Sequence, residues 1–265
     1  MKQAVKRLLG QTIFASRLDA LLMRNVAVTV GFHRVKDTVD PGDPLTVTTR
    51  LFQRHLEFFR RHFRVVPLRD IVQKLERGQR LNRELAITFD DGYRDNFETA
   101  APVLEKLSLP ATFFVVTQWI GTDVVPHWDG ERNVSHPWMT WDQVRQLHRK
   151  GFEIGAHTRT HVDLGRISGA EARRELVGAW IDLEREIGTA PELFAYPFGG
   201  TNHLTEANRE LVKAAGFRCC CSSFGGTNTT GGSAFHLQRI PISGWHASPP
   251  QFGFEVALRR SLLPT

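Results

Sequence analysis

The stretch Ile87-Thr88-Phe89-Asp90-Asp91-Gly92-Tyr93 places two adjacent carboxylates directly after a short apolar run. An apolar run that ends in a glycine turn predicts a buried strand. Carboxylates at a buried strand end are costly to desolvate unless a partner compensates their charge. A turn beginning at Gly92 would bring both carboxylates into one cleft, with one on a metal ion and one beside it. A solvated strand end is the alternative for an isolated Asp-Asp-Gly.

The composition excludes several classes of protein. The chain has 265 residues, of which 41% are hydrophobic and 23% charged, as in an ordinary globular domain. No segment approaches the roughly 20 apolar residues of a membrane span. Residues 1–24 carry five basic side chains against one acidic one, and the whole chain has a net charge of +6. The remainder is close to neutral, which argues against a nucleic-acid partner.

The N-terminal segment, residues 1–25, predicts an amphipathic helix that precedes a single domain at 26–265. We expect its apolar stripe to pack on the body or on a second subunit in a homo-oligomer, and contact with an anionic membrane surface is the alternative. Arg17 and Asp19 interrupt the apolar run that a secretory signal needs, so we expect a cytoplasmic location or the inner membrane surface. The stripe consists of Val5, Leu9, Ile13, Leu18, Leu21 and Leu22.

Short apolar runs alternate with helical patterns along the rest of the chain. This alternation predicts an α/β fold with a parallel sheet covered by helices. About seven such units favour a closed or nearly closed (β/α) barrel, whose functional residues lie at the carboxyl ends of the strands. Strands are expected at 26–32, 85–89, 111–116, 153–156, 193–196, 217–222 and 239–242, and helices near 48–63, 69–77, 95–107, 140–150, 168–187 and 205–215.

Polar residues follow several of the predicted strands. His157 and His161 come after the strand at 153–156, and two histidines four apart on a helical turn can bind one metal ion. With one carboxylate they leave metal positions open for water and substrate, as in catalytic sites. The segment 194–200 predicts an exposed turn with backbone N–H groups toward the cleft, and His33 follows the first strand. Two surface histidines are the alternative for the pair.

These motifs resemble those of the polysaccharide deacetylase family, which is carbohydrate esterase family four or the NodB-homology domain. Residues 88–92 (TFDDG), 157–161 (HTRTH) and 196–199 (YPFG) are similar to its first three motifs, within a similarity that runs from about residue 26 to residue 242. The resemblance implies a distorted (β/α) barrel. It also implies a hydrolase that removes an N-acetyl group from an amino sugar in a polysaccharide, including exopolysaccharide, or in a lipid-linked glycan.

The resemblance also implies roles for individual residues. Asp90 would be the general base, and Asp91, His157 and His161 would bind a divalent metal ion, usually Zn²⁺. The backbone N–H of Phe198 would help to hold the oxyanion.

The sequence departs from the family pattern at three places. Ala195 stands where the third motif usually opens with an arginine that orients the base. The Asp-x-Trp motif is not recognisable around residues 219–224, and the Leu-x-His that supplies the general acid is replaced at residues 237–241 (LQRIP). Arg239 is the candidate for the role of the missing arginine.

The general acid is assigned to His33. Residues 26–35 resemble the start of a subgroup that acts on poly-N-acetylglucosamine, whose barrel strands are permuted in sequence. In that subgroup a histidine after the first strand occupies the place of the missing acid. His236 is the second candidate, but it precedes its strand and is expected at the opposite rim.

Other functions stay open at this point. Two histidines and one carboxylate also bind iron in non-haem Fe(II) oxygenases, which have no need of a second carboxylate as base. A glycan-binding barrel that has lost activity would explain the missing motifs. Retention of the three ligands and the base favours the hydrolase. Trp128, Trp138 and Trp141 are candidates to stack on the sugar rings of an N-acetylated glycan.

Overall fold

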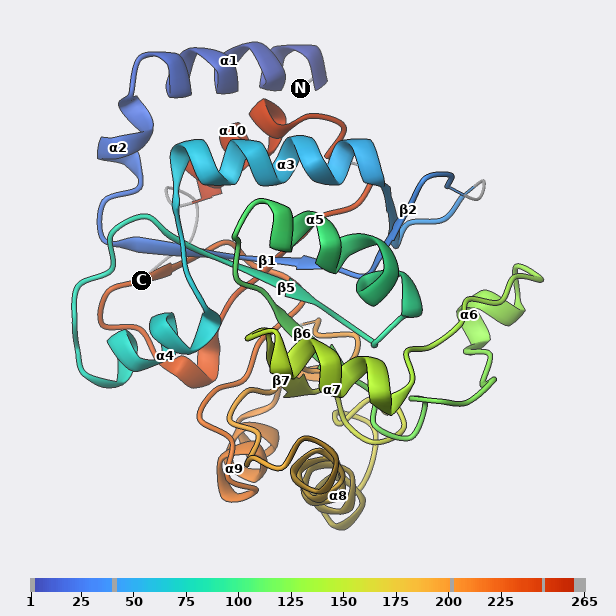
Figure 1. Ribbon diagram of the computed structural model, residues 1–265. Helices are drawn as coiled ribbons and strands as arrows, with labels where there is room; N and C mark the ends of the chain where they lie inside the picture. Colours follow the sequence, from blue (N-terminus) through green and yellow to red (C-terminus); the bar gives the residue numbers. More distant parts are fainter. Residues whose placement is uncertain (1–2, 40–41, 201–202, 245, 260–265) are drawn as a thin grey trace.

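Parallel strands form the centre of the fold in a computed structural model, which describes residues 3–39, 42–200, 203–244 and 246–259 (Figure 1). The strands β1 (Val26–Phe32), β5 (Glu84–Phe89), β6 (Thr112–Val115) and β7 (Glu153–Ala156) pair in the order β7-β6-β5-β1. All of their residues are buried. Burial on both faces explains why these strands read as nearly continuous apolar runs.

Three shorter strands extend this sheet. In the described chain, β4 (Arg64–Val65) pairs with β5 and β9 (Ile240–Pro241) pairs with β1, both in parallel. The strand β8 (Thr227–Thr229) pairs with β1 in the antiparallel sense. The prediction of a parallel sheet is therefore correct for most strands and wrong for β8.

Single bridges close the sheet into a distorted barrel. Phe194 pairs with Ala156 at the end of β7, Ala195 pairs with Cys221, and Cys221 pairs with Leu237 just before β9. Because β9 pairs with β1, these contacts complete a ring of neighbouring segments. The strands predicted at 193–196 and 217–222 are thus present only as bridges.

Helices surround the barrel, and the six predicted ones are present. The helix predicted at 95–107 begins as a π-helical segment, η1 (Asn96–Ala100), and continues as α5. The chain also forms α6 (His127–Gly130), α10 (Pro249–Arg259) and a small sheet of β2 (Arg34–Lys36) and β3 (Thr46–Thr48), none of which the sequence predicted. The predicted helices are α3 (Thr49–His62), α4 (Leu68–Glu76), α5 (Ala101–Lys106), α7 (Trp141–Arg149), α8 (Gly169–Ile187) and α9 (Glu206–Ala214).

The N-terminal segment forms two helices, α1 (Gln3–Ala15) and α2 (Leu18–Leu22), with Arg17 in a left-handed conformation between them. Helix α1 lies along α10 at the top of Figure 1. Its buried residues are Gly10 and Phe14, whereas Val5 and Leu9 of the predicted stripe are exposed. Of this stripe, Ile13 packs against the core. The expectation that the stripe packs on the body is wrong for its other residues, because α1 approaches α10 through a different face. No helix in the described ranges has the length and apolarity needed to cross a bilayer.

The carboxyl ends of β1, β5 and β7 lie at one rim of the barrel. His33 follows β1, Asp90 follows β5 and His157 follows β7. Parallel pairing places these ends side by side, so the polar residues beyond them meet.

Candidate active site

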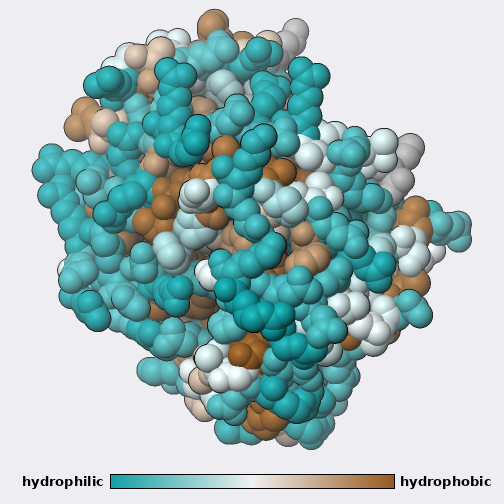
Figure 2. Space-filling model, in the orientation of Figure 1, coloured by the Kyte–Doolittle hydropathy of each residue, from teal (hydrophilic) through white to brown (hydrophobic). Residues whose placement is uncertain are grey.

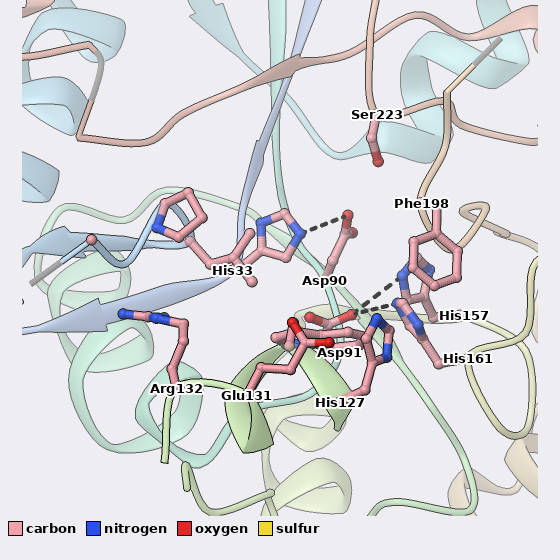
Figure 3. Close-up of a pocket in the computed structure, with 14 residues that line it drawn as sticks. His33, Asp90, Asp91, His127, Glu131, Arg132, His157, His161, Phe198 and Ser223 are labelled. Carbon is pink, nitrogen blue, oxygen red and sulfur yellow. Dashed lines mark ion pairs between the residues drawn. The ribbon is translucent and has the colours of Figure 1, made fainter. Parts of the chain in front are cut away.

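The chain turns sharply at Asp91. This residue has a φ of +73° and Gly92 has a φ of +90°, both in the left-handed region. A left-handed conformation costs a residue other than glycine about 1 to 3 kcal/mol and is found at functional sites. The turn therefore starts one residue earlier than the sequence indicated. It directs the carboxylates of Asp90 and Asp91 into one cleft (Figure 3).

Asp91, His157 and His161 converge on one point. The Asp91 Oδ1 atom lies 3.4 Å from His157 Nε2 and 3.3 Å from His161 Nε2. One candidate ligand atom from each residue lies within 4.8 Å of the others. Burial by itself would raise the pKa of Asp91, but the facing imidazoles of His157 and His161 hold it well below its usual range.

This donor set fits a divalent metal ion. Asp91 Oδ1 is buried and has no hydrogen-bond partner among the described residues. A buried anionic oxygen that faces two imidazole nitrogens is stabilised by a cation. Two histidines and one carboxylate form a catalytic zinc set that keeps a position for water or substrate.

A backbone carbonyl orients the first histidine. His157 Nδ1 lies 2.8 Å from the carbonyl oxygen of Ala195, so Nδ1 carries the proton and Nε2 is available as a ligand. Ala195, which stands where the family has an arginine, thus orients His157 through its backbone carbonyl. The helical turn predicted to join the histidines is absent, because Thr158 and His161 have φ values of +61° and +58°. A loop brings the two rings together.

Asp90 forms a buried ion pair with Arg239. The guanidinium donates two parallel hydrogen bonds of 2.7 Å to the carboxylate, and a third of 3.0 Å to Thr88 Oγ1. Both charged side chains are almost completely buried. Burial alone would raise the pKa of Asp90, but the charge of Arg239 brings it below its usual value. Arg239 therefore holds the carboxylate in place and ionised.

His33 faces Asp90 from the other side of the cleft (Figure 3). Its Nε2 atom lies 4.0 Å from Asp90 Oδ2. The backbone carbonyl of His33 accepts a hydrogen bond of 2.7 Å from Asn96, which fixes this loop. His236 is exposed and contacts Glu206 at 3.7 Å, and it does not line the cleft.

The cleft is a cavity of about 590 Å³ that contains His33, both carboxylates and both histidines. Phe198 lines it and has a φ of +61°. Within the described chain, no acceptor takes a hydrogen bond from the Phe198 N–H. Of the three candidate tryptophans only Trp128 lines the cavity, since Trp138 stacks on Tyr93 at 4.5 Å and Trp141 packs against the core.

A buried arginine connects two walls of this cavity, which the sequence did not indicate. Arg34 is fully buried and donates two hydrogen bonds, of 3.0 and 2.9 Å, to Asp129 and one of 2.8 Å to Asp43. Asp129 lies in α6 beside Trp128, and Asp43 precedes Pro44. Trp128 and Pro44 both line the cavity. The signal that the sequence offered for this contact was a basic residue, Arg34, directly after His33 at the end of the first predicted strand.

The comparisons with known proteins agree with this fold. A family model described as polysaccharide deacetylase matches residues 77–220, more than half of the chain. The chain therefore belongs to the polysaccharide deacetylase family. The family and the barrel fold predicted from the sequence are confirmed.

Individual relatives are distant. The Bacillus subtilis (strain 168) protein named "Putative polysaccharide deacetylase YxkH" is 23% identical over 211 residues, which cover 78% of this chain and 69% of that protein. Poly-beta-1,6-N-acetyl-D-glucosamine N-deacetylase of Escherichia coli (strain K12) is 26% identical over 139 residues, which cover 51% of this chain and only 21% of that protein. The structure of IcaB from Ammonifex degensii matches with a TM-score of 0.71 at 22% identity, over 88% of this chain and 97% of that one.

Proposed function

We propose that this chain is a metal-dependent N-deacetylase that acts on an N-acetylated amino sugar within a glycan. The observation that carries the proposal is the position of Asp90, held by Arg239 beside the three candidate ligands Asp91, His157 and His161. The similarity to the Escherichia coli enzyme supports a substrate of the poly-N-acetylglucosamine type. A lipid-linked glycan of the same sugar chemistry is included in the proposal.

A divalent ion bound by these ligands, with Zn²⁺ favoured by the donor set, would polarise the amide carbonyl and lower the pKa of the attacking water. Asp90 accepts a proton from this water as its oxygen attacks the carbonyl carbon. The N–H of Phe198 donates a hydrogen bond to the oxyanion that forms. Protonated His33 then gives its proton to the amide nitrogen, the C–N bond breaks, and acetate and the free amine leave.

The contact between Asp90 and Arg239 also bears on the alternatives. An oxygenase has no use for a second carboxylate held ionised beside the ligands. The absence of the family's usual arginine and of the Asp-x-Trp motif was the reason to consider an inactive glycan-binding barrel. Arg239 supplies that charge from another segment, which favours an active enzyme.

The test is acetate release from a β-1,6-linked N-acetylglucosamine oligosaccharide. We expect the purified protein to release equal amounts of acetate and free amine, to lose this activity with a chelator, and to regain it with Zn²⁺ or another divalent ion. Asp90→Asn should retain bound metal and lose activity by roughly 10² to 10⁴. His157→Ala should lose both. Oligosaccharide binding without acetate release under every metal condition would instead identify a binding protein.

A further inference from the structure

Helices α1 and α2 expose aliphatic side chains at the outer edge of the molecule. Val5, Leu8 and Leu9 of α1 are 44%, 63% and 41% exposed, and Leu18 and Leu21 of α2 are 49% and 67% exposed. Figure 2 shows hydrophobic side chains among hydrophilic ones over both helices. Such a group of exposed aliphatic residues on adjacent helices marks an interaction surface.

The opposite face of α1 packs against the body of the protein. A Cβ atom on Gly10 would lie 1.8 Å from the Pro250 carbonyl oxygen, and one on Gly253 would lie 2.3 Å from the Phe14 ring. This close contact, with the ion pair of 2.9 Å between Lys6 and Glu255, fixes the rotation of α1. The aliphatic side chains therefore point toward solvent because the packing of the opposite face fixes the orientation of α1.

The net positive charge of the chain lies in the segments that form or adjoin these helices. Residues 1–24 and 49–62 contain nine basic and two acidic residues, so the rest of the chain has a net charge of −1. Helix α3 adjoins α1 through Phe58, whose ring lies 4.8 Å from that of Phe14. Of the two acidic residues, Asp19 is buried against Arg83, which leaves only Glu57 exposed. The exposed arginines are Arg7, Arg17, Arg24, Arg50, Arg54, Arg60 and Arg61.

We propose that the aliphatic face of α1 and α2, together with the exposed arginines Arg7, Arg17 and Arg24 of the same segment, docks on an anionic lipid surface. Aliphatic side chains enter the boundary between headgroups and acyl chains, and the arginines attract the anionic headgroups. A second copy of this chain fits less well, since a two-fold contact would bring both sets of arginines together. Docking would hold the deacetylase at the membrane, where a lipid-linked or growing glycan is within reach.

The test is co-sedimentation of the full chain with lipid vesicles, in the absence of glycan. We expect binding to phosphatidylglycerol-containing vesicles, much weaker binding to pure phosphatidylcholine, and a marked loss at high salt. Leu8→Gln with Leu21→Gln, and separately Arg7→Gln with Arg17→Gln, should each weaken binding roughly tenfold or more. Matched controls on α8, Ile181→Gln and Arg173→Gln, should bind like the wild type.

Three outcomes would overturn this proposal. They are absence of binding to anionic vesicles, equal binding to both kinds of vesicle, and a dimer in solution that the leucine substitutions dissociate. The leucine substitutions should leave acetate release from a soluble oligosaccharide unchanged. Because vesicle binding is measured without substrate, its failure would not bear on the proposed activity.

Discussion

Asp90 and Asp91 are neighbours in the chain but have different electrostatic partners. Asp90 is paired with a permanent cation, Arg239, whereas Asp91 faces two imidazoles that offer neutral nitrogen ligands. The first arrangement keeps a carboxylate ionised and leaves it free to accept a proton. The second leaves an anionic oxygen for a metal ion. In the proposed mechanism this difference of partners suits Asp90 to the role of the base and Asp91 to that of a metal ligand.

The role of Arg239 can be tested through the pH profile. In Arg239→Gln the positive charge is lost while the burial of Asp90 remains, and burial favours the protonated carboxyl. The pKa of Asp90 should therefore rise, and the acidic limb of kcat/KM should move to higher pH. Arg239→Lys keeps the charge and should shift the limb less. A lower but unshifted profile in Arg239→Gln would mean that Arg239 has only a structural role.

The proposed proton-donor role of His33 can be tested against the alternative donor, His236. His33→Ala should lower kcat by roughly 10² to 10⁴ and leave the metal content unchanged. His236→Ala should have little effect, because this exposed side chain lies outside the cleft. Acetate release and metal analysis on both variants make the comparison. The assignment is wrong if His33→Ala turns over at a near-normal rate.

At the scale of elements, Arg34 joins β2 to α6 and to the segment around Asp43. All three parts adjoin the cleft, since His33 precedes Arg34 and the other two supply its walls. Its guanidinium reaches two carboxylates at once, which a single ammonium group cannot reproduce. The shape of the cavity thus depends on one buried side chain that does not touch the candidate metal ligands.

Arg34→Lys should therefore affect substrate binding more than chemistry. One buried carboxylate loses its partner and its loop loosens, so KM for the oligosaccharide should rise roughly tenfold while the metal content stays unchanged. The matched control is Arg145→Lys on α7, where the arginine pairs with Asp142 and Glu186 away from the cleft. A lower Tm with an unchanged KM would show that Arg34 supports the fold without shaping the cleft.

At the scale of the whole molecule, a buried histidine makes stability depend on pH. His55 of α3 is completely buried, its Nε2 lies 3.1 Å from the His246 carbonyl oxygen, and its Nδ1 has no partner in the described chain. Burial lowers the pKa of His55 from 6.5 to about 4. Between these values the unfolded chain binds the proton and the folded protein does not, so stability falls as the pH decreases.

The titration of His55 should lower the free energy of unfolding by about 2 kcal/mol between about pH 7 and pH 5. His55→Gln keeps a donor toward the carbonyl but cannot titrate, so it should remove this part of the pH dependence. His236→Gln, at an exposed histidine, should leave the dependence as in the wild type. Urea unfolding at both pH values measures the difference. An unchanged pH dependence in His55→Gln would contradict the argument.

Local pattern in the sequence predicted much of the fold. Strands β1 and β7 and six helices have the expected positions. A strand buried on both faces and an amphipathic helix each give a pattern that can be recognised within a few neighbouring residues. The same pattern placed His33, Asp90, Asp91, His157 and His161 at one rim, since parallel strands end together. The resemblance of the chain to one family was then confirmed by a family model that matches residues 77–220, and the barrel fold by a solved structure of similar fold.

Contacts between distant segments were decided only by the tertiary structure. Arg239 reaches Asp90 from a segment 149 residues away, and Arg34 reaches Asp129 across 95 residues. The family resemblance suggested Arg239 as a partner of Asp90, but nothing in the local pattern around either arginine specifies its partner, because closure of the barrel brings the segments together. The packed face of α1 was likewise decided by the fit of Gly10 against α10, and most of its apolar stripe remained outside. The sequence by itself thus determined most of the helices, the main parallel strands and the candidate site carboxylates, whereas packing determined which charges support them.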